Sequence, residues 1–107
     1  MISLKSEREI GIMTRAAEVL KKVFLEVEPA VAAGTTTDEL DQIAEKVIES
    51  SGAQSAFKGY RGFPKTACIS INEEVVHGIP GKRKLREGEI VSFDIGCKID
   101  GYYADAA

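Results

Sequence analysis

The feature that most constrains the fold is a strict alternation of side chains around one turn near the end of the sequence. From Ile90 to Ile99, one set of alternate positions is apolar: Val91, Phe93, Ile95, Cys97 and Ile99. A period of two is that of a β-strand with one buried face. Asp100-Gly101 follows as a strong signal for a two-residue turn, so the chain is predicted to return as an antiparallel strand.

This hairpin also predicts which residues face one another. If Asp100-Gly101 forms a type I′ turn, Ile99 lies opposite Tyr102, and Asp105 lies opposite Gly96. Asp94 and Asp105 then share a face as diagonal neighbours, with Cα atoms about 7–8 Å apart. Because Gly96 has no side chain, we expect the space between the two carboxylates to be open.

Two carboxylates on one face predict a metal site. They repel each other, and a divalent cation removes that conflict. Oxygen ligands at this separation suit one ion, or a pair of ions about 3.5–4 Å apart. The alternative is that one aspartate is a solvated strand residue and the other a turn or edge carboxylate. Spacing alone leaves both interpretations open.

Two amphipathic helices are predicted before the strands. The capping box Ser6–Glu9 begins a long helix that ends near residues 29–34, and the capping box Thr36–Glu39 begins a shorter one. Three- and four-residue spacing predicts the inward side chains. In the first helix these are Ile10, Met13, Ala17, Leu20, Phe24 and Val27, and in the second they are Leu40, Ile43, Val47 and Ile48.

Short strands are predicted at residues 54–58, 66–71 and 75–76. Helices followed by antiparallel strands indicate an α+β fold with two N-terminal helices packed on one face of an antiparallel β-sheet. The sequence stops within the returning strand of the hairpin, so residues 1–107 are predicted to form a single half-domain.

Composition excludes several functional classes. The 107 residues include 44% hydrophobic and 29% charged side chains, which is typical of one soluble globular domain. A net charge of −3 predicts no nucleic-acid partner, and the basic run Lys82–Arg86 is interpreted as a solvated connection. The sequence has no apolar run that could span a membrane and no secretory signal. A cytoplasmic protein with two free cysteines, Cys68 and Cys97, is expected.

Three longer motifs resemble the type I methionine aminopeptidases. These motifs are Thr66–Pro80, which contains Asn-Glu-Glu-Val-Val-His-Gly-Ile-Pro, then Gly88–Gly96 and Asp100–Asp105. The resemblance extends through both predicted helices. It implies half of the pita-bread (aminopeptidase/creatinase-like) fold, and an enzyme that removes the initiator methionine from new polypeptides when the next residue is small.

The resemblance also implies roles for individual residues. Asp94 and Asp105 match the first two metal ligands of a dinuclear centre that uses Co, Mn, Fe or Zn. His77 matches a catalytic histidine that contacts the substrate near the scissile peptide bond. Tyr60, Phe63 and Cys68 match residues of the pocket for the methionine side chain. Taken alone, His77 would more often be a strand-end histidine that bonds a backbone carbonyl, and Cys68 a small buried residue.

The resemblance implies that further ligands, a histidine and two glutamates, come from a second half of the fold. With two ligands in place of five, the chain is expected to bind metal weakly and to have little or no aminopeptidase activity. Its expected partners are a peptide or nascent-protein N-terminus beginning with Met and the missing C-terminal half. An alternative is a structural module in which a second copy of the chain pairs with the first.

Overall fold

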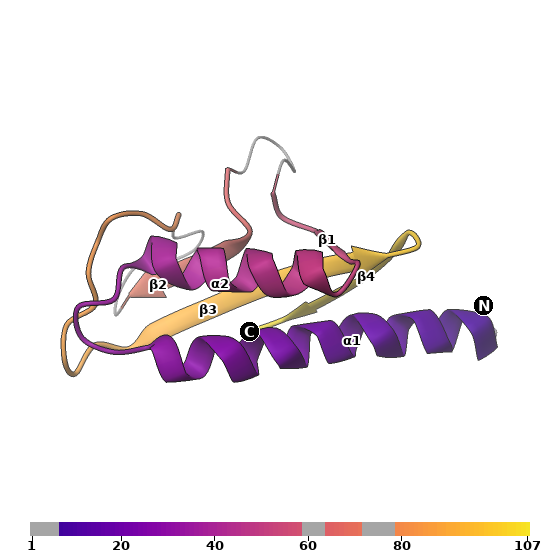
Figure 1. Cartoon of the computed structure of the whole chain (residues 1–107), viewed down its shortest axis with the longest axis horizontal. Coiled ribbons are helices and arrows are strands. Elements are labelled where there is room, and N and C mark those ends of the chain that lie inside the picture. The colour runs from indigo at the N-terminus through magenta and orange to yellow at the C-terminus, as the bar shows by residue number, and fades with distance from the viewer. Residues whose placement is uncertain (1–6, 59–63, 72–78) are drawn as a thin grey trace, which may run out of the picture.

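Two helices and four strands make up the part of the chain that a computed structural model describes, residues 7–58, 64–71 and 79–107. Figure 1 shows their arrangement. The helices are α1 (Glu7–Val27) and α2 (Thr37–Ser50), with the short 3-10 helix η1 (Glu28–Ala30) after α1. The strands are β1 (Gln54–Ser55), β2 (Ala67–Ile71), β3 (Val91–Ile99) and β4 (Tyr102–Ala106).

The sheet is antiparallel and is organised around β3. One side of β3 pairs with β2 along residues 91–95 and with β1 at residues 97–98, and the other side pairs with β4. The helices run antiparallel to each other across one face of this sheet (Figure 1). The predicted α+β fold, with two helices on an antiparallel sheet, is confirmed.

The hairpin between β3 and β4 has the predicted register. Ile99 pairs with Tyr102, and Gly96 pairs with Asp105. Asp100 and Gly101 have φ angles of 49° and 83°, the two positive values that a type I′ turn requires. The alternation in the sequence therefore determines the face on which each hairpin side chain lies.

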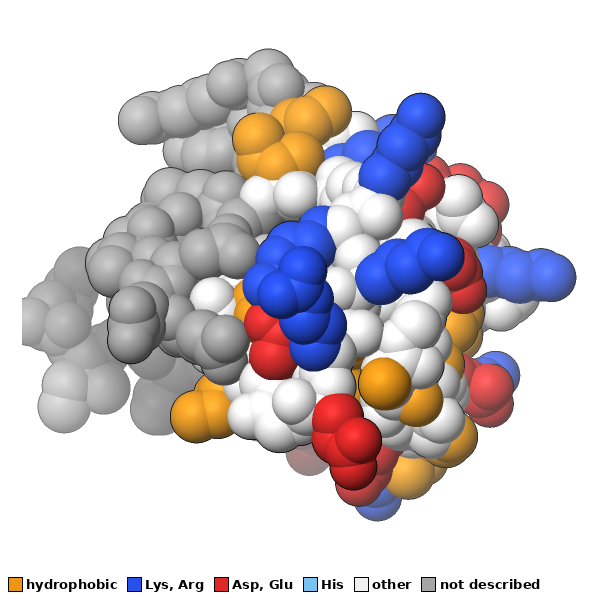
Figure 2. All heavy atoms as spheres, turned by 90° about the vertical axis from the view of Figure 1, so that its left-hand side faces the viewer, with side chains coloured by type: hydrophobic (Ala, Val, Ile, Leu, Met, Phe, Trp, Pro, Cys, Tyr) orange, Lys and Arg blue, Asp and Glu red, His pale blue; other side chains and the backbone are white. Residues whose placement is uncertain are grey.

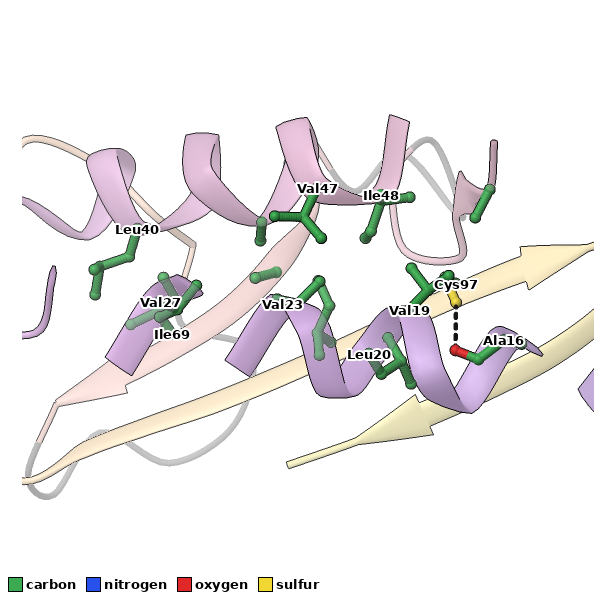
Figure 3. Packing of buried hydrophobic residues seen from close by; sticks show 14 of the residues in the cluster. Ala16, Val19, Leu20, Val23, Val27, Leu40, Val47, Ile48, Ile69 and Cys97 are labelled. Carbon is green, nitrogen blue, oxygen red and sulfur yellow. Dashed lines mark hydrogen bonds between the residues drawn. The ribbon is translucent and has the colours of Figure 1, made fainter. Parts of the chain in front are cut away.

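The core lies between the helices and the sheet (Figure 3). Alternate residues of β2 and β3 point into it, as predicted, and so does Cys97, whose Sγ donates a hydrogen bond to the Ala16 carbonyl at 3.4 Å. The fully buried side chains with the largest volumes are Leu40, Ile48, Ile95, Val23, Thr66 and Cys97. The helices thus cover one face of the sheet completely along its centre.

The buried stripe of α1 differs from the predicted one. The buried residues are Ile12, Ala16, Val19, Leu20, Val23 and Val27. Ile10 is 54% exposed and Ala17 is exposed, so the prediction was wrong at both positions. α1 carries apolar residues on more than one side, and contact with α2 and the strands selects the side with the small residue Ala16. Phe24 still packs edge-on against Phe93, at a centroid distance of 5.5 Å.

The predicted start of α2 is confirmed, and the predicted end of the first strand is not. The Thr36 side chain accepts from the Glu39 amide and the Glu39 carboxylate accepts from the Thr36 amide, which completes the capping box. β1 ends at Ser55 rather than Lys58, because the Lys58 amide donates to Ser55 Oγ in a turn. Ser6 and the predicted strand at residues 75–76 lie outside the described residues.

Charges of both signs mix at the end of the molecule that carries the basic loop. Lys82, Arg83, Lys84 and Arg86 are exposed, and Arg83 forms an ion pair with Glu89. Figure 2 shows lysine and arginine side chains of this end interspersed with acidic and apolar ones, so this face is not uniformly basic. Within the described ranges, neither helix has the length and apolarity needed to cross a membrane.

Candidate metal centre

Asp94 and Asp105 lie on the face of the sheet that the helices leave open. Asp94 pairs with Cys68 of β2, and Asp105 pairs with Gly96 of β3. Since Asp94 precedes Gly96 by two positions, its side chain is on the same face as that of Asp105, and both aspartates are exposed. The predicted diagonal arrangement of the two carboxylates is therefore present.

A hollow of about 410 Å³ lies beside Asp94 on this face. Its wall is formed by residues of the two paired strands and by the end of the chain after β4. It is lined by Cys68, Ser70, Val91, Ser92, Phe93, Asp94 and Ala107. The hollow gives one of the two carboxylates a neighbouring space that a small group could enter.

The Cys68 side chain belongs to the same wall. It is half-buried and lies directly across the strand pair from Asp94. Burial raises the pKa of the Cys68 thiol above its ordinary value, and the negative charges of Asp94 and Asp41 raise it further. Cys68 is therefore a neutral thiol at pH 7, and its soft, weakly polar surface suits contact with an apolar group.

The space above Gly96 is closed, contrary to the prediction. A Cβ atom built at Gly96 would lie 3.1 Å from Ala56 Cβ and 3.3 Å from Phe57 Cε1. The Ala56 amide also donates to the Gly96 carbonyl at 3.0 Å. Gly96 is therefore needed for a close approach of the segment after β1, and it does not leave an empty channel between the carboxylates.

Phe57 also lies on this face, although no pattern in the sequence predicts it there. It lies in the turn after β1, where no alternation marks an inward or outward side. A signal was nevertheless present, because a glycine inside a strand often marks a close contact with another segment. Phe57 supplies an aromatic edge over β3 between the strand positions of the two aspartates.

Three of the predicted site residues belong to the segments between the described ranges. His77, Tyr60 and Phe63 lie outside the described residues, and their roles stay predictions. Their described neighbours, Pro64 and Ile79, bound the two segments that contain them.

The described residues do not form a metal site by themselves. They contain no group of three or more His, Cys, Asp or Glu side chains close enough to hold an ion. The pair Asp94 and Asp105 fits a divalent cation by the chemistry of its donors, because carboxylate oxygens are suitable ligands for such ions. Two carboxylates alone would bind such an ion weakly.

Comparison with protein families assigns the chain. Residues 11–107 match the model of metallopeptidase family M24. The chain belongs to family M24. The match runs from residue 11, within α1, through α2 and the four described strands, so the M24 assignment does not depend on the aspartates alone.

Curated relatives of this M24 chain are methionine aminopeptidases. The chain is 49% identical to methionine aminopeptidase 1 of Bacillus subtilis over 107 residues, which are 100% of this chain and 43% of the relative. It is 52% identical over 106 residues to the methionine aminopeptidase of Borreliella burgdorferi, covering 99% of this chain and 42% of the relative. The chain thus spans less than half the length of the relatives it matches.

Solved structures agree in fold. The methionine aminopeptidase of Thermotoga maritima superimposes with a TM-score of 0.92 at 37% identity, over 98% of this chain and 43% of that chain. The prolidase of Pyrococcus furiosus has a TM-score of 0.77 at 20% identity and covers 95% of this chain and 29% of that one, a likeness of fold alone. The M24 chain therefore has half of the pita-bread fold of these peptidases.

Proposed function

We propose that this chain is the N-terminal half-domain, residues 1–107, of an M24 enzyme that removes N-terminal methionine from polypeptides. The register of the β3–β4 hairpin is the observation that carries the proposal, because it sets Asp94 and Asp105 on one face. The curated relatives, which match over the full chain, are methionine aminopeptidases and support the choice of reaction. The substrate would be a peptide or nascent-protein N-terminus in which a small residue follows the methionine.

Asp94 and Asp105 are the proposed metal ligands. Family M24 consists of metallopeptidases, and two carboxylates that share a face suit Co²⁺, Mn²⁺, Fe²⁺ or Zn²⁺. When bound, such cations would polarise the scissile carbonyl and lower the pKa of a water molecule. The remaining ligands are proposed to come from outside these 107 residues, because the relatives are more than twice as long as this chain.

The hollow beside Asp94 is the proposed binding site for the methionine side chain. Cys68 lines it, and a neutral thiol suits contact with a flexible thioether. Tyr60 and Phe63 are proposed to contribute to the same pocket. His77 is the proposed catalytic residue of this half, where its ring would donate a hydrogen bond near the scissile peptide bond.

The isolated chain is proposed to have little or no peptidase activity. The test is hydrolysis of Met-Ala and Met-Gly peptides with added Mn²⁺ or Co²⁺, compared with a complete methionine aminopeptidase at equal concentration. We expect turnover at least about a thousandfold lower, because ligands and proton-transfer groups act as a unit and their losses are large. Turnover near that of the complete enzyme would show that two ligands and His77 suffice.

Metal binding is tested separately from activity. Mn²⁺ is paramagnetic and broadens the amide signals of residues near it. In the ¹⁵N-labelled chain we expect broadening centred on Asp94 and Asp105, at millimolar rather than micromolar Mn²⁺. Broadening centred on another acidic region, such as Asp38 and Glu39 at the start of α2, would contradict the proposed ligands.

A second candidate function is a homodimeric structural module without peptidase activity. One observation favours it: among the described residues, β4 pairs with β3 along one edge, and no strand pairs with its other edge. Such an edge offers backbone donors and acceptors to a second copy. Sedimentation at several concentrations distinguishes the candidates, since a stable dimer supports the module and a monomer at high concentration contradicts it.

A further inference from the structure

The first turns of α2 hold two segments of the chain that lie far apart in sequence. At the start of α2, Thr37 Oγ1 accepts from the Gly81 amide at 2.9 Å and donates to the Gly81 carbonyl at 3.2 Å. The Asp38 amide donates to the same carbonyl at 2.9 Å, and the Thr37 amide donates to the Arg83 carbonyl at 3.1 Å. The chain that follows residues 72–78 is therefore fixed to α2.

The chain that precedes residues 72–78 is fixed to the same part of the helix. Asp41, one turn further along α2, accepts from the Ala67 amide at 2.7 Å through Oδ1. The Lys65 ammonium group contacts Asp38 Oδ1, also at 2.7 Å. Ala67 is the first residue of β2, and its neighbour Cys68 lies opposite Asp94. One helix thus holds both described flanks of the segment that contains His77.

We propose that Asp41 is a positioning residue for the site on the opposite face of the sheet. Its carboxylate fixes the start of β2, and this sets the place of Cys68 beside Asp94. Thr37 holds Gly81 at the other described flank of residues 72–78, so the two contacts fix the positions of both flanks relative to α2. Asp41 itself is on the helix-covered side of the sheet, where it is buried and binds the backbone of β2.

The chemistry of Asp41 supports a role beyond packing. Its residue is 3% exposed, and burial raises the pKa of its carboxyl group. The amides of Ala67 and Thr66 and the charge of Lys65 act against this effect, whereas the charge of Glu45 adds to it. A buried carboxylate is costly, and an apolar residue at this position of α2 would pack without that cost. The carboxylate instead provides directional hydrogen bonds to the backbone of β2.

The purpose assigned to Asp41 rests on the proposed peptidase site, but the contact it makes can be tested without metal or substrate. The experiment measures amide hydrogen exchange and cross-strand nuclear Overhauser contacts in the ¹⁵N-labelled chain. Asp41→Ala removes the acceptor, and Asp41→Asn keeps an oxygen at the same place without the charge. Glu45→Gln is the matched control, since Glu45 is one turn further along α2 and pairs with Lys58 instead of β2.

We expect Asp41→Ala to speed amide exchange at Ala67 by about tenfold or more. The reason is that the substitution removes roughly one charge-assisted hydrogen bond to this amide. The contact between Cys68 and Asp94 should weaken, while the contact between Ile71 and Val91 at the far end of the β2–β3 pair stays. Asp41→Asn should restore exchange at Ala67 to within about threefold of the unsubstituted chain, and Glu45→Gln should leave it unchanged.

Three results would overturn the proposal. The first is unchanged exchange at Ala67 in Asp41→Ala. The second is equal acceleration at Ala67 and at Val23 of α1, which would mean a general loss of stability. The third is an Asn variant that behaves like the Ala variant. Failure of Mn²⁺ to bind at Asp94 would instead count against the proposed function, so the two failures are distinguishable.

Discussion

The two faces of the sheet differ in what they present and in what holds them. On the face covered by the helices, Ala67, Ile69, Ile71, Ile95 and Cys97 are each no more than 3% exposed. On the other face, Ser92, Asp94 and Asp105 are exposed, and Cys68 and Ser70 are only half-buried. The same strands thus carry a packed core on one side and polar, accessible side chains on the other.

This difference separates the groups that stabilise the fold from those that are available for chemistry. Apolar burial against α1 and α2 is the main favourable contribution to folding, and it uses the alternate residues that point away from the aspartates. The open face can therefore carry two like charges at small cost to stability, because both carboxylates keep access to water. Substitutions on the two faces should have different kinds of effect.

The largest effect on stability is expected on the covered face. Ile95→Ala removes most of a side chain that is 0% exposed and leaves a cavity between β3 and the helices. We expect the free energy of unfolding to fall by about 3 kcal/mol. Denaturant unfolding followed by circular dichroism measures this. Ser92→Ala, on the open face of the same strand, is the control, with a change within about 0.5 kcal/mol. Equal effects at both positions would remove the distinction between the faces.

The second largest expected effect is on cation binding, and it concerns the open face. Asp94→Asn keeps the size of the side chain but removes one of the two proposed anionic ligands. We expect affinity for Mn²⁺ or Co²⁺ to fall at least tenfold, which is about 1.4 kcal/mol, with a change in unfolding free energy below about 1 kcal/mol. Calorimetric titration and denaturant unfolding give the two quantities. Unchanged cation binding would exclude Asp94 as a ligand.

A smaller effect on stability is expected at Gly96, where the segment after β1 covers part of the open face. Gly96→Ala places a methyl group 3.1 Å from Ala56 Cβ and 3.3 Å from the Ala104 carbonyl oxygen, closer than comfortable packing allows. The segment after β1 must shift, at a cost of about 1 kcal/mol in unfolding free energy. Thermal unfolding of this variant measures the cost. A gain in stability would mean that Ala56 and Phe57 can move away freely.

The smallest expected effect is a pH dependence carried by Asp41. Burial raises the pKa of this carboxyl group in the folded chain, so the folded state binds the proton more tightly than the unfolded state. The contribution of Asp41 to stability is therefore fully present below its unfolded pKa and is lost as the pH rises through its folded pKa. As the pH falls from 7 to about 4, the free energy of unfolding of the unsubstituted chain should rise relative to that of Asp41→Asn.

Denaturant unfolding of both chains across this pH range tests the sign of that dependence. Carboxylates other than Asp41 titrate in both variants, so their effects cancel in the difference. A difference that is constant with pH would show that the pKa of Asp41 is the same in the folded and unfolded chain.

Some of the site could be predicted residue by residue. The Asp100-Gly101 turn leaves few alternatives for the hairpin register, so the shared face of Asp94 and Asp105 followed from the sequence. The stripe of α1 was harder, because the helix has apolar residues on several sides and only its neighbours decide which side is buried. The covering of Gly96 by Ala56 and Phe57 is a contact between segments about forty residues apart, which no local pattern specifies.

The sequence by itself determined the two helices, the β3–β4 hairpin with its register, and the family to which the chain belongs. Alternation, capping residues and turn residues act over a few positions, so they can be interpreted without a fold. Only the tertiary structure decided that Asp41 binds the backbone at the start of β2, that Thr37 holds Gly81, and that Phe57 closes the space over Gly96. These contacts depend on how the helices lie across the sheet, because each joins residues that only packing brings together.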